Sequence, residues 1–154
     1  MATTIKTKTD KVKGAARKRR GKGRSLGLDT DDSVQLVSSV RAGFKFEKLL
    51  AFHKTSGLSL ERIGQVAGIS KRTLTRRRAA GRLRSDESDR LFRLSRIFDL
   101  AVGLFEGDST AGRQWLEKPQ SGLSGAVPLE FASTDVGACE VEKLITRLEH
   151  GIFT

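Results

Sequence analysis

The sequence predicts an all-α fold, and three observations support this prediction. After residue 31, apolar residues recur three and four positions apart through most of the chain, which is the spacing of one face of an α-helix. Residues that cap helices stand before these periodic segments, and glycine or proline follows several of them. No segment alternates apolar and polar residues over six positions, so β-strands have little support.

Charge divides the chain into three parts. Residues 1–30 hold ten basic and two acidic side chains, residues 31–84 hold twelve and four, and residues 85–154 hold seven and twelve. The first part is dominated by Lys, Arg, Gly and Thr and has little apolar surface to bury, so we expect a disordered basic tail there. The basic second part favours nucleic acid, whose phosphates supply affinity, and the acidic third part favours contact with protein.

The composition limits the chain to one ordinary domain or two small ones that share a core. It has 154 residues, of which 37% are hydrophobic, and no run of about 18 apolar residues that would cross a membrane. Its first residues do not resemble a secretory signal. The single cysteine, Cys139, has no neighbours at zinc-ligand spacing, and we expect it to be a small core residue. These features predict a soluble cytoplasmic protein without a metal.

Two helices are expected before residue 58. The first has its cap among residues 31–33 and ends before Gly43, and its apolar side consists of Val34, Val37 and Val40. The second ends at Gly57, and its apolar side consists of Phe46, Leu49, Leu50 and His53. We interpret His53 as a packed or solvent-tipped histidine and not as a metal ligand, because no second histidine stands near it.

Residues 59–81 carry the strongest local pattern in the chain, and it resembles a helix-turn-helix. Ser59 and Ser70 are placed to cap two short helices, and Gly68 supplies the positive φ of the tight turn between them. The small Gly64 permits the two helices to approach closely. The apolar seam that they share is predicted to consist of Ile63, Ala67, Ile69 and Leu74.

The side of the second helix away from this seam is the predicted DNA-binding surface. Its residues are Ser70, Lys71, Arg72, Thr75 and Arg76. An arginine guanidinium matches guanine O6 and N7, and hydroxyl groups reach phosphates or base edges. A merely solvated charged face is the alternative, but the caps, glycines and seam all agree with the DNA-binding geometry. Arg77 stands where this pattern usually has an apolar residue, and we expect its aliphatic stem to contact a neighbour.

Four further helices are expected in the acidic part. A long one follows Ser85 as its cap, with an apolar stripe of Leu91, Leu94, Phe98, Ala101 and Phe105. A short helix from Ser109 carries Trp115 and Leu116 and stops before Pro119. Pro128 begins the third, and the last opens at Thr134 and Asp135 and ends near Gly151.

A series of short motifs runs from residue 81 to residue 151. In order they are Gly81-Arg82-Leu83, Glu87-Ser88-Asp89-Arg90-Leu91, Trp115-Leu116, Pro119, Pro128-Leu129-Glu130 and Arg147-Leu148-Glu149-His150-Gly151. In this order they resemble the antitoxins of the Xre/MbcA/ParS family, with a match that extends from about residue 59 to the end of the chain. Gln120 and Ser124 depart from the family pattern and affect the expected shape of one loop.

The resemblance implies a homodimeric antitoxin of a type II toxin-antitoxin pair. Such a protein neutralises a RES-domain toxin that consumes NAD by covering its active site, and it represses its own operon. The division that follows is a helix-turn-helix DNA-binding region at 31–84 and a helical toxin-binding domain at 85–154. The implied partners are the toxin and operator DNA, without a membrane, and the chain is expected in the bacterial cytoplasm, at the nucleoid when it is bound to DNA.

The end of the chain is the predicted toxin-binding segment. Its residues are Glu149, His150, Gly151, Ile152 and Phe153, which we expect to project past the last helix. Exposed apolar groups such as Ile152 and Phe153 are wasteful unless they dock, and the alternative is a frayed tail that folds back on its own core.

Two other functions remain open on the sequence. One is a stand-alone Xre-like transcription regulator whose acidic half only dimerises. The other is an enzyme, which has little support: Glu140 and Glu142 point in different directions on a helix, and Glu149 beside His150 lacks a nucleophile at a plausible spacing. We therefore expect no enzyme and no cofactor.

Overall fold

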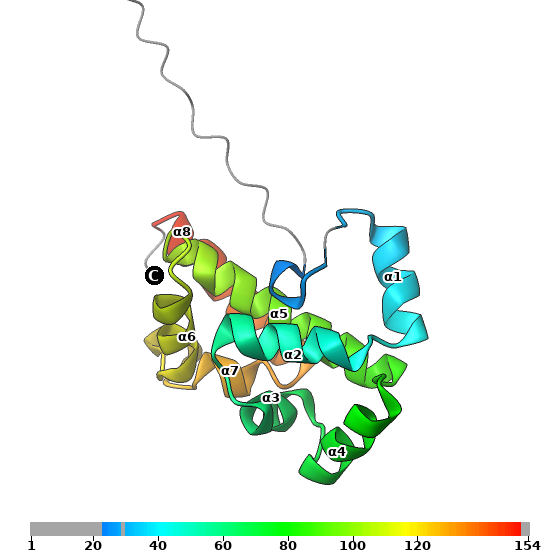
Figure 1. Ribbon diagram of the computed structural model, residues 1–154. Coiled ribbons are helices and arrows are strands. Elements are labelled where there is room, and N and C mark those ends of the chain that lie inside the picture. The colour runs from blue at the N-terminus through cyan, green and yellow to red at the C-terminus, as the bar shows by residue number, and fades with distance from the viewer. Residues whose placement is uncertain (1–22, 29, 152–154) are drawn as a thin grey trace, which may run out of the picture.

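In the computed structural model, which describes residues 23–28 and 30–151, these residues fold as helices and loops (Figure 1). The elements are η1 (Arg24–Leu26), α1 (Ser33–Ala42), α2 (Phe46–Ser56), α3 (Leu60–Ala67), α4 (Lys71–Ala80), α5 (Ser85–Leu104), α6 (Ser109–Glu117), η2 (Ser121–Leu123), α7 (Pro128–Phe131) and α8 (Asp135–Glu149). The only β-bridge in these ranges joins Lys45 to Arg82. The predicted all-α fold, a helix-turn-helix followed by a helical C-terminal part, is confirmed.

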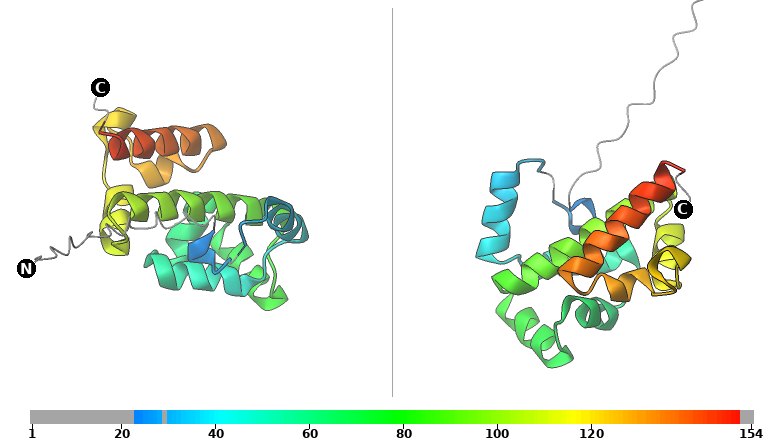
Figure 2. Two further views of the ribbon diagram at one scale, coloured as in Figure 1. Left: turned by 90° about the horizontal axis from the view of Figure 1, so that it is seen from above. Right: turned by 180° about the vertical axis from the view of Figure 1, so that it is seen from behind.

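Helix α5 is the centre of the molecule. In Figure 2, η1, α2 and α3 lie on one side of it, α7 and α8 lie on the other, and α6 packs beside its C-terminal end. Its predicted stripe is buried at Leu91, Leu94, Phe98 and Ala101, whereas Phe105, which follows the last helical residue, is half-buried. No helix in the described ranges has both the length and the apolar character needed to span a bilayer.

One hydrophobic core joins the basic and acidic parts of the chain. Phe52 of α2 and Phe98 of α5 are both buried, and their rings meet edge to face with centroids 5.7 Å apart. Leu129 and Val141, on the other side of α5, and Leu116 of α6 are fully buried in the same cluster. The two halves therefore share α5 and do not form separate cores.

The β-bridge closes the segment that contains α2, α3 and α4. The amide of Phe46 donates to the carbonyl of Gly81 (2.9 Å), and the amide of Leu83 donates to the carbonyl of Phe44 (2.8 Å). The amide of Phe44 donates to the hydroxyl of the buried Ser88 on α5 (2.8 Å). The start of α2 and the end of α4 are thus held together at the N-terminal end of α5.

The apolar side predicted for the first helix is wrong at Val34 and Val37. Val34 and Val37 are 74% and 48% exposed, whereas Leu36 is buried and the half-buried Val40 packs against the core. Helix α1 stands at the edge of the molecule and contacts α5 with one narrow face, to which Leu36 and Val40 contribute the inward-facing apolar side chains (Figure 1). Val34 and Val37 lie on the exposed side of the helix.

The folded part of the chain begins before residue 30. Ser25 and Leu26 are buried, and the hydroxyl of Ser25 donates to the carbonyl of Ser95 on α5 (3.4 Å). The amide of Ser25 donates to the carboxylate of Asp99 (3.5 Å), and burial raises the pKa of Asp99 although hydrogen bonds from this segment oppose it. The predicted tail therefore does not include residues 23–28, because Leu26 reaches the core. Residues 1–22 lie outside the described part of the chain.

Two residue roles predicted for the acidic part are also wrong. Arg84 and not Ser85 caps α5, because the carboxylate of Glu87 accepts a hydrogen bond from the Arg84 amide (2.8 Å) and begins the helix one residue earlier. Cys139 is exposed, since Ala138 and Val141 occupy the inward face of α8 and Cys139 points away from it. Thr134 caps α8 as expected.

Candidate nucleic-acid interface and C-terminal region

Helices α3 and α4 meet at a tight turn whose local structure agrees with the sequence pattern. The hydroxyl of Ser59 accepts a hydrogen bond from the amide of Arg62 (3.0 Å), and that of Ser70 accepts one from Thr73 (3.2 Å). Gly68 ends α3 with φ +66°, a conformation that side chains rarely adopt. The predicted caps and turn of the helix-turn-helix are confirmed.

Close packing sets the relative position of these two helices. A Cβ atom on Gly64 would lie 2.7 Å from the carbonyl oxygen of Ile69 and 2.9 Å from a methyl of Leu74, so only glycine fits there without a shift. Ile63, Ala67, Ile69 and Leu74 are all buried, as predicted for the seam. The orientation of α4 on α3 is therefore fixed by packing and not by its charged residues.

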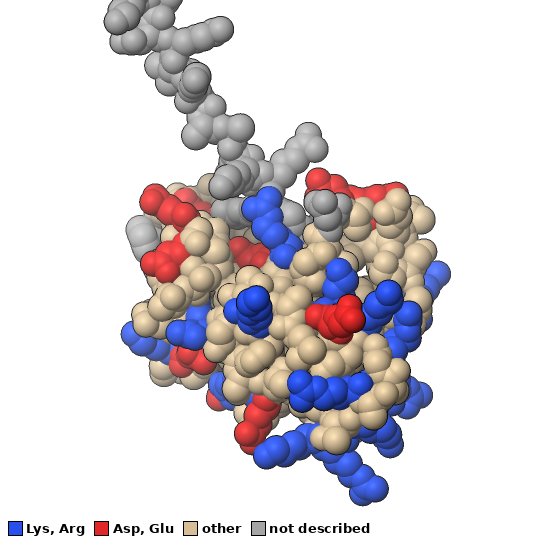
Figure 3. Space-filling view, viewed as in Figure 1, with Lys and Arg blue, Asp and Glu red and all other residues tan. Residues whose placement is uncertain are grey.

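The outer face of α4 presents unpaired positive charge. Lys71, Arg72, Thr75 and Arg76 are exposed and lie away from Leu74, the one buried residue of the helix. Within residues 23–28 and 30–151, none of these three basic side chains forms an ion pair. Figure 3 shows Lys and Arg side chains gathered at the α4 end of the molecule. Unpaired cations on one helix face attract phosphates.

The two hydroxyl groups of the predicted site are already engaged within α4. Ser70 caps the helix and donates to the hydroxyl of Thr73 (2.9 Å), and Thr75 donates to the carbonyl of Lys71 (3.1 Å). A phosphate oxygen only accepts hydrogen bonds, so each hydroxyl must release its present acceptor before it can bind one. The cations Lys71, Arg72 and Arg76 are therefore the stronger part of the predicted site.

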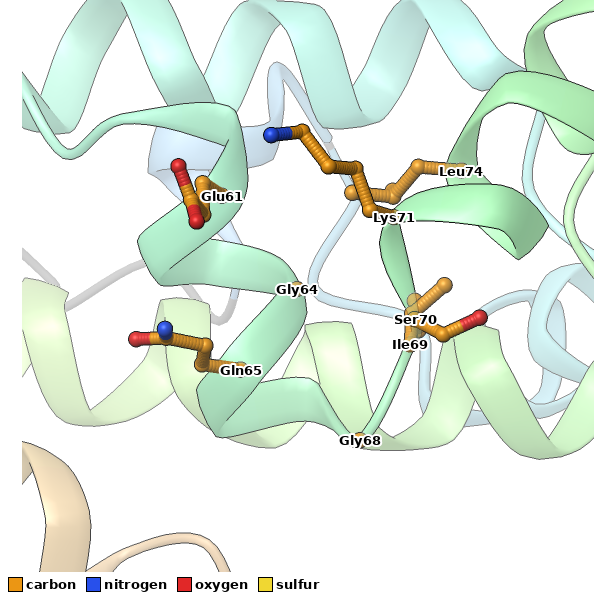
Figure 4. Close-up of a pocket in the computed structure, with 8 residues that line it drawn as sticks. All are labelled: Glu61, Gly64, Gln65, Gly68, Ile69, Ser70, Lys71 and Leu74. Carbon is orange, nitrogen blue, oxygen red and sulfur yellow. The ribbon is translucent and has the colours of Figure 1, made fainter.

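A groove of about 380 Å³ runs between α3 and α4. It is lined by Glu61, Gly64, Gln65, Gly68, Ile69, Ser70, Lys71 and Leu74 (Figure 4). Glu61 and Gln65 extend from α3, and Lys71 extends from α4. The sequence prediction did not include Gln65, although its place outside the buried seam and its exposed amide make it a candidate contact.

Two side-chain contacts from α4 and α5 hold the helix-turn-helix on the rest of the molecule. Arg77 binds Glu87 with both ends of its guanidinium fork, with Nε 2.8 Å from Oε2 and Nη2 3.0 Å from Oε1. Arg90 of α5 donates to the carbonyl of Ala67 at the end of α3. The sequence predicted only a contact of the aliphatic stem of Arg77 with a neighbour. In the structure its guanidinium group holds α4 on α5.

The pair of Arg77 and Glu87 is largely removed from solvent. Their side chains are 14% and 6% exposed. Burial raises the pKa of the Glu87 carboxyl, but hydrogen bonds from Arg77 and from the backbone amide of Arg84 outweigh burial, so this pKa lies below its ordinary value. Glu87 therefore stays ionised and caps α5 while it holds α4.

The predicted toxin-binding segment lies at the end of α8. Glu149 is the last residue of the helix, so it does not project past it as expected. The amide of His150 donates to the carbonyl of Thr146, and the amide of Gly151, at φ +65°, donates to that of Leu148 (both 3.2 Å). Ile152 and Phe153 lie outside the described residues.

Ion pairs neutralise part of the acidic charge on α8. Lys143 binds Glu140 (2.8 Å), and Arg96 of α5 binds Glu142 (3.0 Å). A hydrogen bond from Lys143 is the largest influence on the Glu140 carboxyl and lowers its pKa. The outer face of α8 is therefore of mixed charge.

The fold and the surface of α4 define a helix-turn-helix DNA-binding protein with a second helical part. Residues 35–96 match the antitoxin Xre-like helix-turn-helix domain, and residues 100–151 match the antitoxin Xre/MbcA/ParS C-terminal toxin-binding domain. A protein of Yersinia enterocolitica named antitoxin Xre is 38% identical over 140 residues, which cover 90% of this chain and 95% of the relative. The chain belongs to the Xre antitoxin family.

Two further relatives carry the same name. The antitoxin Xre of Photorhabdus laumondii is 33% identical over 130 residues, which cover 84% of this chain and 88% of the relative. That of Pseudomonas putida is 36% identical over 66 residues, which cover 43% and 41%. The two matched domains meet within α5, the helix that both halves of the core share.

Proposed function

We propose that this antitoxin neutralises a RES-domain toxin that consumes NAD, by covering its active site, and that it represses its own operon as a homodimer. We assign DNA binding to residues 31–84 and toxin binding to residues 85–154. The chain acts in the cytoplasm, at the nucleoid when it is bound to DNA, and has no catalytic activity of its own. The observation that carries the DNA half of this proposal is the unpaired cationic face of α4.

The DNA half is tested with Arg72→Ala and Arg76→Ala in titrations of the full chain with DNA from upstream of its own gene. Each variant should lose about 1–3 kcal/mol of binding free energy if the arginine reads a base. If both contact only phosphates, the double variant should lower the slope of log K against log salt by about 2. Lys118→Ala, which removes an exposed cation at the end of α6, is the matched control and should change neither quantity. Unchanged affinity in both arginine variants would contradict this interface.

The toxin half rests on the match of residues 100–151 to a toxin-binding domain and on the place of residues 149–151 at the end of α8. The exposed outer face of that helix supplies polar contacts, and Ile152 and Phe153 supply the apolar ones. A segment of this kind fits a cleft, because a few apolar anchors inside a polar rim give most of the binding free energy at protein interfaces.

The toxin half is tested by co-expression with the product of the adjacent gene. The full chain should co-purify with that product, restore growth and preserve cellular NAD. A chain that ends at Gly151 should lose protection, whereas the Arg72→Ala/Arg76→Ala variant should keep it. If the shortened chain protects fully, the toxin contact lies elsewhere on the molecule. If no adjacent product binds, the chain acts as a stand-alone regulator.

A further inference from the structure

A second group of exposed cations lies beside the C-terminal end of α4. Lys45 stands at the start of α2, Arg78 in the last turn of α4, and Arg82 directly after α4. Within residues 23–28 and 30–151, none of the three forms an ion pair. We call these three residues the bridge cluster, because Lys45 and Arg82 form the β-bridge. Figure 3 shows that Lys and Arg side chains continue from the α4 end of the molecule along the side where α1, α2 and α5 meet.

The β-bridge places two like charges opposite each other. In an antiparallel bridge the Cβ atoms of the paired residues lie on the same side, about 4.5–5.5 Å apart, and like charges at such a pair are destabilising. No carboxylate of the described residues compensates the pair of Lys45 and Arg82: Glu47, two residues after Lys45, is exposed and binds neither cation. An anion that binds between the two side chains would relieve this repulsion.

Contacts with the protein hold both arginines in place and leave many of their N–H groups free. The Cζ atom of Arg78 lies over the ring of Phe46, 5.8 Å from its centroid, and the N–H groups of Arg78 donate to no described residue. Nη1 of Arg82 donates to the carbonyls of Gly43 (2.7 Å) and Ala42 (3.4 Å). Since a guanidinium has five N–H donors in a planar fork, each arginine keeps donors for a phosphate.

The place of the bridge cluster relative to α4 indicates which part of a DNA duplex it would meet. The first residues of a recognition helix contact base edges. Helix α4 has ten residues and is about 15 Å long, whereas the major groove is about 12 Å wide, so its C-terminal end extends to the sugar-phosphate backbone. Arg78 follows Lys71 by two turns on the same side of α4, and the β-bridge lies just beyond that end.

We propose that the bridge cluster binds backbone phosphates of DNA at the edge of the major groove into which α4 inserts. Phosphate contacts carry no sequence information, so the cluster positions the protein on any duplex while the outer face of α4 reads the sequence. The inference rests on DNA binding through α4 in the proposed function and adds a sequence-independent contact to it. The exposed carboxylate of Glu47 opposes this contact, because it stands close to Lys45 in the first turn of α2.

Salt-controlled titrations of the full-length chain test the cluster on two duplexes of equal length, one from upstream of its own gene and one of unrelated sequence. Lys45→Gln/Arg78→Gln/Arg82→Gln should lower the slope of log K against log salt by about 2–3 on both duplexes, and it should weaken both by on the order of 100-fold at about 0.15 M salt. The ratio of the two affinities should stay the same, because only phosphate contacts are lost.

A double variant separates DNA binding from a structural role of Arg82. Lys45→Gln/Arg78→Gln keeps the hydrogen bonds of Arg82 to the carbonyls after α1 and should lower the slope by about 2. Lys54→Gln/Lys118→Gln is the matched control: it removes two exposed cations, one at the other end of α2 and one after α6, and should leave the slope unchanged.

The opposite change of charge gives a result that no folding defect can produce. Glu47→Gln should strengthen binding to both duplexes, because it removes a negative charge beside the bridge cluster. An unchanged slope in the triple variant, or a loss of affinity confined to the upstream duplex, would overturn the proposal. A wild type that does not prefer the upstream duplex would instead contradict operator recognition in the proposed function, and the unrelated duplex would still test the cluster.

Discussion

Glu87 performs two structural tasks with one carboxylate. It caps α5 through the Arg84 amide and binds the guanidinium of Arg77, so the start of one helix and the end of another depend on it. The helix-turn-helix pattern favours an apolar residue at position 77, and the sequence alone indicated only that the arginine had to be accommodated. Its partner lies ten positions away on another helix, and no local spacing rule predicts such a pair.

Replacement of Glu87 should expose this double role in the pH dependence of stability. The pKa of the Glu87 carboxyl is lowered in the folded state. Its contribution to the free energy of unfolding is therefore complete above the ordinary pKa of 4.5 and is lost as pH falls through the folded-state pKa. Glu87→Gln should therefore cost about 1–3 kcal/mol at neutral pH, and the difference from wild type should shrink in acid. Thermal unfolding monitored by circular dichroism at several pH values measures this. Glu140→Gln, which breaks an exposed pair, should change stability little.

Asp99 should show the opposite dependence. Burial raises the pKa of Asp99 above the ordinary value of 3.8, so ionisation of this carboxyl disfavours the folded state. Its contribution to the free energy of unfolding therefore falls as pH rises from 3.8 through the folded-state pKa. Asp99→Asn keeps an acceptor for the Ser25 amide and removes the charge, so it should raise the melting temperature at neutral pH and not in strong acid. The exposed Asp31→Asn serves as control. A lower melting temperature at neutral pH would show that the carboxylate itself is required.

At the scale of helices, the sequence predicted the features that depend on interactions between residues close together in the chain. The caps of α3, α4 and α8, the turn at Gly68 and the buried seam follow from short-range geometry, and the structure agrees with them. For α1 the apolar periodicity placed Val34 and Val37 on the buried side and passed over Leu36, because three valines outnumber one leucine. Which side faces the core depends on where α5 lies. The contact of Leu26 with α5 was missed for the same reason.

The close approach of α3 and α4 can be tested at Gly64. Alanine favours helices over glycine, but here its Cβ would lie 2.7 Å from the backbone carbonyl oxygen of Ile69, too close without a shift of the backbone. Gly64→Ala should therefore destabilise the chain by about 1–3 kcal/mol and weaken DNA binding by tilting α4. Gln65→Ala, on the exposed side of the same helix, should not destabilise it. A stabilised Gly64→Ala chain would show that packing does not set the angle between the two helices.

At the scale of the whole molecule, α5 makes one cooperative unit of two functional parts. The charge pattern along the sequence indicated a division near residue 85, and it does describe where charges lie. It carries no information on packing, however, and the core passes through that division without a break. Which residues of the C-terminal region contact a toxin depends on the shape of the toxin, so the sequence offers only the resemblance to its family.

A destabilising substitution in one half of the molecule should therefore lower the stability of the other half as well. Phe52→Ala, in α2, should cost about 3–5 kcal/mol, because it leaves a cavity beside Phe98. Trp115, the only tryptophan, reports on α6 in the other half, and its fluorescence transition in denaturant should move together with the circular dichroism signal. Phe131→Ala, at a 39% exposed position, should have a much smaller effect. Separate transitions for the two signals would indicate two independent domains.

The β-bridge between Lys45 and Arg82 brings the two ends of the DNA-binding segment side by side, although they are far apart in the sequence. Because the chain enters at Phe44 and leaves at Leu83 through adjacent, hydrogen-bonded positions, a related segment with the same spacing between its ends can join the polypeptide at the same two points. Operator specificity can thus be grafted from one antitoxin to another with this segment, provided that the acceptor supplies a carboxylate where α5 begins and the α5 side chains, such as Phe98, that pack on α2.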